Sequence, residues 1–283
     1  MNKSHFLIIN ADDFGFSQGV NAAIIQAHEE GILTSTSLMV TGDAAQEAIA
    51  LAKNHPHLAV GLHLVLVCGK SVLPPAQIPH LVDSQGNFSH NPTQAGLNYQ
   101  FNQATRAELR LEISAQLEKF RNSGLNLAHV DGHLHLHVHP VILNILTEFA
   151  GEFQIKFIRL PSEELTKNLK VDRRNLLTKI IWSIVFGQLR NYGEGLLKAH
   201  HINFADRVYG LLQTGDMSEE YLLSLIPQIE AKLVEIYAHP ALVNTDTNNG
   251  GEIELKALLS HKVRELLTVK GFELSNCAKV IHS

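Results

Sequence analysis

Short apolar segments and longer amphipathic segments alternate along almost the whole chain. The apolar segments are rich in Val, Ile, Leu and Thr, which is typical of buried strands, and the segments between them carry apolar residues at helical spacing. We expect strands at residues 6–10, 34–41, 58–67, 126–131, 155–160 and 233–238. We expect helices at residues 18–30, 44–53, 105–120, 140–149, 219–232 and 252–268. Alternation of this kind predicts parallel βαβ units.

Residues at several segment ends support these assignments. Ser17 is a suitable N-cap for the first helix, and Gly31 follows the end of that helix. Thr105 and Glu108 have the spacing of a capping box, which predicts that the third helix begins there. Pro140 fits the first turn of the next helix, where a backbone N–H is not needed. The boundaries are therefore predicted from side chains as well as from periodicity.

The number of alternating units indicates the fold class. About seven strand–helix units are more typical of one (β/α) barrel than of two separate domains. The chain of 283 residues shows no change in composition that would mark a linker. We therefore expect an α/β fold, an irregular TIM-like barrel with about seven parallel strands, as one domain over residues 1–283. A doubly wound open sheet is the alternative, but no GxGxxG motif follows the first strand.

Two segments interrupt this alternation. Residues 68–104 are rich in Pro, Gly, Asn and Gln and predict a long loop insertion, which in a compact domain is a lid, a binding loop or a disordered segment. Residues 165–200 predict an apolar helical insertion centred on Leu176–Leu189, which is too short to span a bilayer. We expect this helix either to pack in a core or an interface, or to contact a membrane or accept a lipid.

Composition excludes several classes of protein. The chain has 23 Lys and Arg residues against 28 Asp and Glu, a net charge of −5, so it lacks the electrostatic signature of a nucleic-acid-binding protein. Hydrophobic residues at 45% and charged residues at 18% are typical of a folded protein. Two cysteines cannot form a disulfide scaffold, and the first apolar stretch is too short for a signal peptide. With no apolar run long enough to cross a membrane, we expect a cytoplasmic protein.

Histidines are concentrated in one short stretch. Five of the 17 histidines lie between residues 129 and 139, all at odd-numbered positions with Asp131 at the remaining one, so a continuous strand would place all five on one face. Such a strand would extend over roughly 33 Å, at about 3.3 Å per residue, which is too long for one metal ion. At most two or three of these side chains can therefore bind a single ion. Taken alone, the stretch is also compatible with a solvated strand face or an adventitious nickel-binding tract.

Other polar residues lie at the ends of predicted strands. Asp12 and Asp13 follow the first strand, and neighbouring carboxylates point in different directions, so one can bind a metal while the other acts as a base. His63, Arg159 and His239 lie near the ends of three later strands. Active sites of parallel barrels form at the carboxyl ends of the strands. Two imidazoles and one carboxylate are a hydrolytic metal-ligand set that leaves room for water and substrate. We therefore expect these residues to converge.

The motifs that contain these residues resemble those of the YdjC-like carbohydrate deacetylases. The similar stretches are Asn10–Gly15, Thr34–Ser37, Gly61–His63, His129–Pro140 and His239–Pro240. The resemblance implies a barrel of the glycoside hydrolase/deacetylase kind and one divalent metal ion, with Asp13, His63 and His133 as ligands. Residues 206–210 and 235–241 look most like the hopanoid-biosynthesis-associated (HpnK-type) branch, which implies removal of the acetyl group from an N-acetylglucosaminyl hopanoid.

Such a reaction needs a base, an acid and groups that orient them. On this hypothesis Asp12 is the general base that accepts a proton from the attacking water, and His239 is the acid that protonates the departing amine. Asp131 and His135 would orient or tune these groups. Arg159 would either keep Asp12 ionised or contact the substrate.

Alternatives exist for the metal, the substrate and the reaction. The resemblance implies Mg²⁺, whereas the ligand types suit Zn²⁺, Co²⁺ or Ni²⁺ better. The substrate is either a glycolipid, which would involve peripheral membrane contact, or a chito-oligosaccharide, and the resemblance favours a homodimer. A glycosidase with two carboxylates, a phosphoesterase and a non-catalytic His-rich metal-binding protein are the other interpretations. No role is predicted for His137 or His139.

Overall fold

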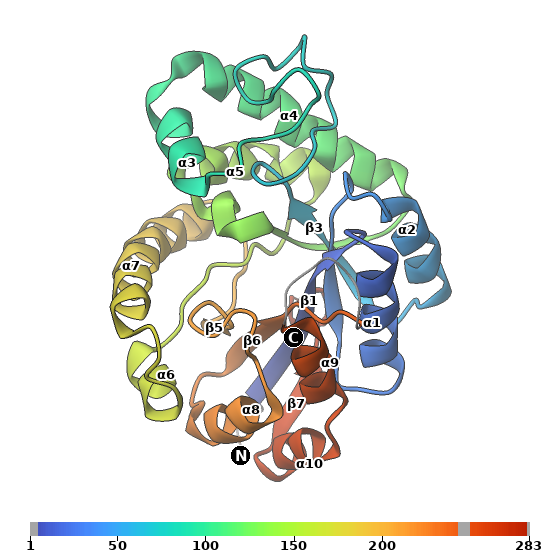
Figure 1. Ribbon diagram of the computed structural model, residues 1–283, viewed down its shortest axis with the longest axis vertical. Coiled ribbons are helices and arrows are strands. Elements are labelled where there is room, and N and C mark those ends of the chain that lie inside the picture. The colour runs from blue at the N-terminus through green and yellow to red at the C-terminus, as the bar shows by residue number, and fades with distance from the viewer. Residues whose placement is uncertain (1–4, 243–249, 282–283) are drawn as a thin grey trace.

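The fold is built on a parallel sheet whose strands are surrounded by helices (Figure 1). The computed structural model describes residues 5–242 and 250–281. The strands are β1 (His5–Phe14), β2 (Ser35–Leu38), β3 (Ala59–Leu64), β4 (Leu127–Gly132), β5 (Arg207–Tyr209), β6 (Leu233–Ala238) and β7 (Phe272–Ser275). Their order is β4-β3-β2-β1-β6-β5, and β7 pairs with the first half of β1. Every pairing between these strands is parallel, which confirms the predicted α/β fold built from βαβ units.

An irregular segment connects the two ends of this sheet. Residues 155–160 were expected to form a strand, but they form only isolated bridges, so this prediction is wrong. The Arg159 N–H donates to Val130 O of β4, and farther along the Val208 N–H of β5 donates to Ser162 O. Pro161 lies between these contacts and has no N–H to donate, which limits regular pairing. The segment thereby links β4 to β5 and gives an irregular, TIM-like barrel.

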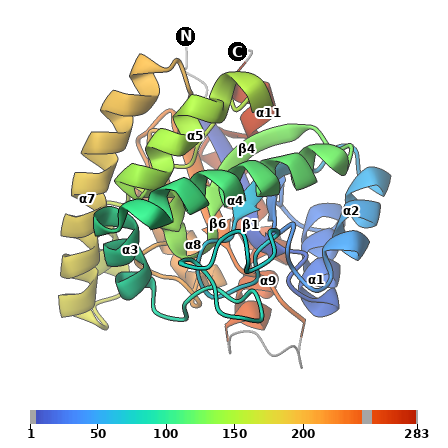
Figure 2. The same ribbon diagram turned by 90° about the horizontal axis from the view of Figure 1, so that it is seen from above.

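Helices lie around the outside of the sheet (Figure 2). The helices between β1 and β5 are α1 (Gln18–Glu29), α2 (Ala45–Asn54), α3 (Pro92–Phe101), α4 (Gln103–Asn122), the 3₁₀ turn η1 (His133–Val138), α5 (Pro140–Phe153), α6 (Leu165–Val171) and α7 (Leu176–Ala199). After β5 follow α8 (Glu219–Leu225), the 3₁₀ turn η2 (Ile226–Gln228), α9 (Gly251–Leu259), α10 (His261–Val269) and α11 (Cys277–Val280). The Ser17 side chain accepts a hydrogen bond from the Val20 N–H, which confirms the predicted cap of α1.

The predicted capping box is wrong. Helix α4 begins before it, and Asn102 is the N-cap residue. Thr105 lies inside the helix and donates to the Asn102 carbonyl, which is a contact typical of a helical threonine. The Glu108 carboxylate accepts hydrogen bonds from the backbone and ring of His80 instead of returning to Thr105. A long-range contact therefore outcompetes the local motif.

Two later helices also differ from the prediction. The helix expected over residues 252–268 is divided at Ser260, whose extended backbone ends α9 and whose side chain caps α10. The helix expected over residues 219–232 ends at Leu225 because Pro227 follows. Both breaks come from residue types that favour helix ends over helix interiors.

The segment of residues 68–104 is ordered and packed, rather than a structureless loop. Its last part is α3, which was not predicted. Ile78, Leu81 and Phe88 are buried against the main core. The Glu112 carboxylate of α4 accepts the N–H groups of Val72 and Leu73 and fixes the start of the segment. The segment of residues 165–200 is helical as predicted, and it consists of α6 and α7.

Side chains of β1 divide between two faces. Leu7 and Ile9 belong to the large core between sheet and helices, whereas Ile8 belongs to a smaller cluster with Phe157 and Tyr237. Asn10 and Asp12 follow Ile8 at alternate positions and are also buried. This face of the barrel therefore changes from apolar to polar toward the carboxyl ends of its strands.

Candidate active site

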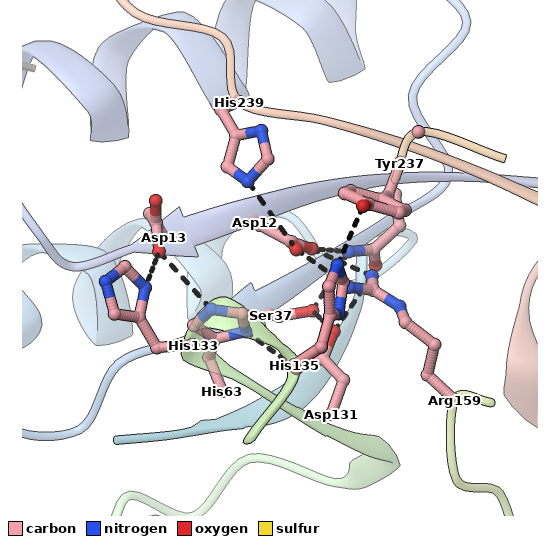
Figure 3. Close-up of polar contacts among 12 residues, drawn as sticks. Asp12, Asp13, Ser37, His63, Asp131, His133, His135, Arg159, Tyr237 and His239 are labelled. Carbon is pink, nitrogen blue, oxygen red and sulfur yellow. Dashed lines mark hydrogen bonds and ion pairs between the residues drawn. The ribbon is translucent and has the colours of Figure 1, made fainter. Parts of the chain in front are cut away.

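A backbone irregularity separates the two neighbouring aspartates of β1. The register with β2 shifts between Ala11 and Phe14, and Asp13 has a left-handed backbone with φ 65°. The Asp12 side chain is buried, whereas Asp13 keeps 18% of its side chain exposed. Figure 3 shows the two carboxylates directed to different partners. The divergence that the sequence predicted for this pair is therefore present.

Asp13, His63 and His133 lie together although they are distant in the sequence (Figure 3). Asp13 Oδ1 lies 3.3 Å from His63 Nε2 and 3.0 Å from His133 Nδ1. One potential ligand atom from each of the three side chains lies within 4.8 Å of the others. The three residues proposed from the sequence thus lie close enough together to share a cation.

The chemistry of this donor set fits a divalent metal ion. The His63 Nδ1–H donates to Asp131 Oδ1 over 2.8 Å, so when the ring is neutral its lone pair is on Nε2, the nitrogen that faces Asp13. One carboxylate oxygen with two imidazole nitrogens is a common set for such metals. Asp12, His63 and Asp131 form a second compact group, but both of its carboxylates bind Arg159. The group around Asp13 therefore fits a cation better.

The same residues show strong electrostatic coupling. Burial disfavours the charged form of His63, but the negative charge of Asp131 and the hydrogen bonds to Asp13 and Asp131 raise its pKa to about 10. Burial also opposes ionisation of Asp13, yet hydrogen bonds from His133 and His63 hold its pKa well below the usual range. The cluster therefore favours a positive charge at this point, either as protons or as a cation.

Arg159 binds three buried carboxylates. Its guanidinium forms two hydrogen bonds with Asp12, of 2.7 and 2.8 Å, and lies 2.8 Å from Asp131 and 2.7 Å from Glu235. It also lies over the ring of Tyr237, 4.6 Å from the centroid. Arg159 is fully buried, so these contacts are not screened by solvent. It therefore holds the Asp12 carboxylate in place through a direct contact, at the site where the sequence placed both residues.

The Asp12 carboxylate has one less crowded oxygen. Oδ1 accepts hydrogen bonds from Asn10 and Arg159, whereas Oδ2 accepts one from Arg159. His239 Nε2 lies 3.9 Å from Oδ2 (Figure 3). The two residues proposed as base and acid thus face each other across a short gap.

Glu254 holds His239 and was not predicted from the sequence. The His239 backbone N–H donates to Glu254 Oε2 over 2.5 Å, and the ring Nδ1 lies 3.8 Å from the same oxygen. Burial opposes the charged form of His239, but Glu254 together with the charges of Asp13 and Asp12 raises its pKa to about 9. Glu235 and Glu254 both lie in mainly apolar segments, which is the one sequence signal that could have indicated them.

The histidine-rich stretch does not continue as a strand. Strand β4 ends at Gly132, and Leu134 and His135 adopt left-handed conformations with φ of 51° and 56°. The histidines therefore reach different partners: His129 the Ser37 hydroxyl, His133 Asp13, His135 the Tyr237 hydroxyl, His137 the Arg159 carbonyl and His139 the ring of Tyr99. Of these five, only His133 belongs to the group around Asp13. This agrees with the expectation that no more than two or three of them could bind a single ion.

Comparison with known proteins identifies the family. The family model described as YdjC-like protein matches residues 6–269, a range that includes every site residue discussed above. The chain belongs to the YdjC-like family. This YdjC-like protein is 34% identical over 268 residues to a carbohydrate deacetylase of Brevibacillus brevis, covering 92% of this chain and 94% of that one. It is 30% identical over 284 residues to a carbohydrate deacetylase of Vibrio cholerae, covering 97% and 96%.

Solved structures agree with this assignment. An Enterococcus faecalis structure, provisionally described as a cellobiose-phosphate cleavage protein, has a TM-score of 0.77 at 26% identity and covers 98% of this chain and 99% of that one. An uncharacterized Agrobacterium tumefaciens protein shares only the fold, with a TM-score of 0.53 at 11% identity and coverage of 98% and 89%. Together with the family model and the curated relatives, the first of these structures confirms the resemblance of the motifs to the YdjC-like family.

Proposed function

We propose that this YdjC-like protein is a metal-dependent hydrolase that removes an N-acetyl group from an acetylated amino sugar. The observation that carries the proposal is that the two neighbouring aspartates, Asp12 and Asp13, contact different groups of residues. Asp13 joins His63 and His133 in a metal-ligand set, while Asp12 stays outside that set and faces His239. The relatives named carbohydrate deacetylases support the same reaction.

Asp13, His63 and His133 would hold the cation. A divalent cation supplies Lewis acidity, which polarises an amide carbonyl and makes a water molecule more acidic. Asp131 would keep the His63 ring in the tautomer that presents Nε2, because its carboxylate accepts the Nδ1 proton. The nitrogen ligands suit Zn²⁺, Co²⁺ or Ni²⁺, and Mg²⁺ is the alternative that the family resemblance favours.

Asp12 is proposed as the general base. Arg159 fixes the carboxylate plane through two hydrogen bonds, and Oδ2 keeps the capacity to accept a proton from a water molecule. Arg159 also binds Asp131 and Glu235. Because Asp131 in turn accepts the hydrogen bond from His63, Arg159 connects the proposed base Asp12 to the proposed metal ligand His63.

His239 is proposed as the general acid. An amide nitrogen leaves poorly as an anion, so a proton donor is needed when the C–N bond breaks. The pKa of about 9 keeps His239 protonated at neutral pH. Its side chain is 20% exposed, which allows contact with a substrate.

The more specific substrate proposal is an N-acetylglucosaminyl hopanoid. It rests on the resemblance of residues 206–210 and 235–241 to the hopanoid-associated branch, and the apolar surface of α7 is compatible with a lipid aglycone. A chito-oligosaccharide is the second candidate, because the similar proteins of Brevibacillus brevis and Geobacillus stearothermophilus are named only as carbohydrate deacetylases. We also propose a cytoplasmic location, a single barrel domain over residues 1–283 and a homodimeric assembly.

Acetate release tests the reaction and separates the two substrates. Purified protein would be assayed with a chito-oligosaccharide and with an N-acetylglucosaminyl lipid, before and after metal chelation and metal return. The proposal predicts acetate release that stops on chelation and returns with the divalent ion. Activity that survives complete chelation would instead favour a glycosidase-type mechanism.

A further inference from the structure

The first part of α7 exposes an unusual number of large apolar side chains. Leu177 is 72% exposed, Ile184 57%, Ile181 51% and Trp182 43%. Over Leu176–Val185 only Lys179 is buried. Single exposed apolar residues need no explanation, but a continuous set of this kind marks a contact surface. In Figure 2, α7 runs along one flank of the molecule and its outer side is uncovered.

A row of aromatic rings connects this surface to the candidate active site. The ring of Trp182 lies 5.4 Å from Phe186, which lies 5.8 Å from His135. The ring of His135 lies 5.0 Å from Tyr237, which lies 5.7 Å from His239. The exposed part of α7 is therefore linked, through the buried rings of Phe186 and Tyr237, to site residues that follow the carboxyl ends of β4 and β6.

The charge of this region differs from that of the whole chain. Residues 165–200 contain seven Lys and Arg residues and two acidic residues, although the chain has a net charge of −5. Lys170 near the end of α6, and Arg173 and Arg174 between α6 and α7, are exposed. Arg174 pairs with nearby carboxylates, but neither Lys170 nor Arg173 forms an ion pair within the described residues. An apolar surface next to a basic segment complements a negatively charged partner.

Two partners could cover such a surface, and the charge distinguishes them. In a symmetric dimer through α7 both copies would bring the same apolar and basic surface to the interface, so neither copy would supply acidic side chains to balance the positive charge. An anionic bilayer instead accepts the apolar side chains and attracts the basic ones, as it does for amphipathic helices that lie in the interface.

We propose that Leu176–Val185 of α7, together with the basic residues before it, docks on the surface of an anionic lipid bilayer. Docking through this surface would hold the open end of the barrel close to the lipid headgroups. The idea that sugars carried by membrane lipids are thereby presented to the site rests on the proposed function. The docking itself does not, because it involves none of the residues proposed for metal binding, base or acid.

Tryptophan fluorescence can test the docking without a label, because Trp182 is the only tryptophan in the sequence. Vesicles of phosphatidylcholine with phosphatidylglycerol would be added to the full-length protein, with vesicles of phosphatidylcholine alone as the comparison. We expect a blue shift of the emission, and quenching by brominated lipids, with the anionic vesicles and a much weaker response with the neutral ones. An unchanged emission with both would overturn the proposal.

Two double variants identify the surface that binds. Leu177→Ser with Ile184→Ser should lower vesicle affinity by about tenfold or more, because two apolar contacts with the bilayer are lost. Leu111→Ser with Val269→Ser, which changes residues 52% and 80% exposed on α4 and α10, should leave the affinity unchanged. Equal loss in both variants would refute the assignment, as would a wild-type dimer that the α7 variant converts to monomers. Asp12→Asn should bind vesicles like the wild type, which separates docking from catalysis.

Discussion

The imidazole of His63 is held between two carboxylates, with Nδ1 2.8 Å from Asp131 Oδ1 and Nε2 3.3 Å from Asp13 Oδ1. The pairing of β3 with β4 places His63 directly opposite Asp131, so this relationship follows from strand register. Asp131 therefore determines which ring nitrogen carries the proton and which one is available to a cation.

Asp131→Asn should weaken metal binding without removing a ligand. The loss of the negative charge weakens the orientation and basicity of His63, so we expect metal affinity to fall by about 10–100-fold. Titration of zinc against a chelating dye would measure this change, and circular dichroism would verify the fold. Asp43→Asn is a suitable control because Asp43 is an exposed carboxylate that pairs only with Lys70 among the described residues. Equal affinities in the two variants would show that Asp131 has no such role.

Asp12→Asn should separate metal binding from catalysis. The amide keeps the size of the side chain but cannot accept the proton from water, so turnover should fall by about 10²–10⁴-fold. Metal content, measured by elemental analysis of the purified protein, should stay close to that of the wild type because Asp12 lies outside the ligand set. Asp13→Asn should instead lower the metal content, because it changes a proposed ligand, and turnover should fall as a consequence. Full turnover in the Asp12 variant would exclude this residue as the base.

Local sequence signals were sufficient for several features. Ser17 caps α1 as expected because capping depends on residues only a few positions apart. The grouping of Asp13, His63 and His133 could be predicted because each lies at or just beyond a strand end, and parallel strands bring these ends to one side of a barrel. The prediction needed the strand order in outline but not the details of packing.

Other features depend on contacts that no local pattern encodes. The alternation from His129 to His139 is that of a strand, but the chain turns at Leu134 and His135 instead, where His135 contacts Tyr237 from a distant strand. Glu254 reaches His239 only because α9 packs beside the end of β6. Such residues become recognisable once the long-range packing is known.

The activity of the protein should decrease in alkaline solution. His239 must donate a proton, and its pKa is raised to about 9 because Glu254, Asp13 and Asp12 outweigh the opposing effect of burial. Turnover should therefore be sustained below this pH and lost as the pH rises through it. Because the proposed activity needs a bound cation, and that cation offsets the charge of Asp13, the midpoint of the decrease should lie at or below this pH, not above it. The dependence of kcat on pH measures this directly, and a kcat that keeps rising above pH 9 would contradict it.

Glu254→Gln should shift that alkaline decrease. The amide oxygen can still accept the His239 N–H, but the negative charge that favours protonated His239 is gone, so the apparent pKa should fall. The kcat profile should move toward lower pH while metal content is unchanged. Glu252→Gln, an exposed change in the same helix, should leave the profile in place. If both variants keep the wild-type profile, Glu254 does not tune the acid.

Gly61→Ala should destabilise the fold around the site. A Cβ at Gly61 would lie 2.4 Å from the ring of His129, which is buried and lies 3.0 Å from the Ser37 hydroxyl, so the ring cannot move freely. We expect a loss of about 1–3 kcal/mol in the free energy of unfolding, as for other overpacked cores. Gly195→Ala in α7 is the matched control, because a Cβ there meets nothing within 4 Å, and it should stabilise the protein by about 0.5–1 kcal/mol. Denaturant titration of both variants measures the difference, and equal stabilities would show that the contact between Gly61 and His129 is not constrained.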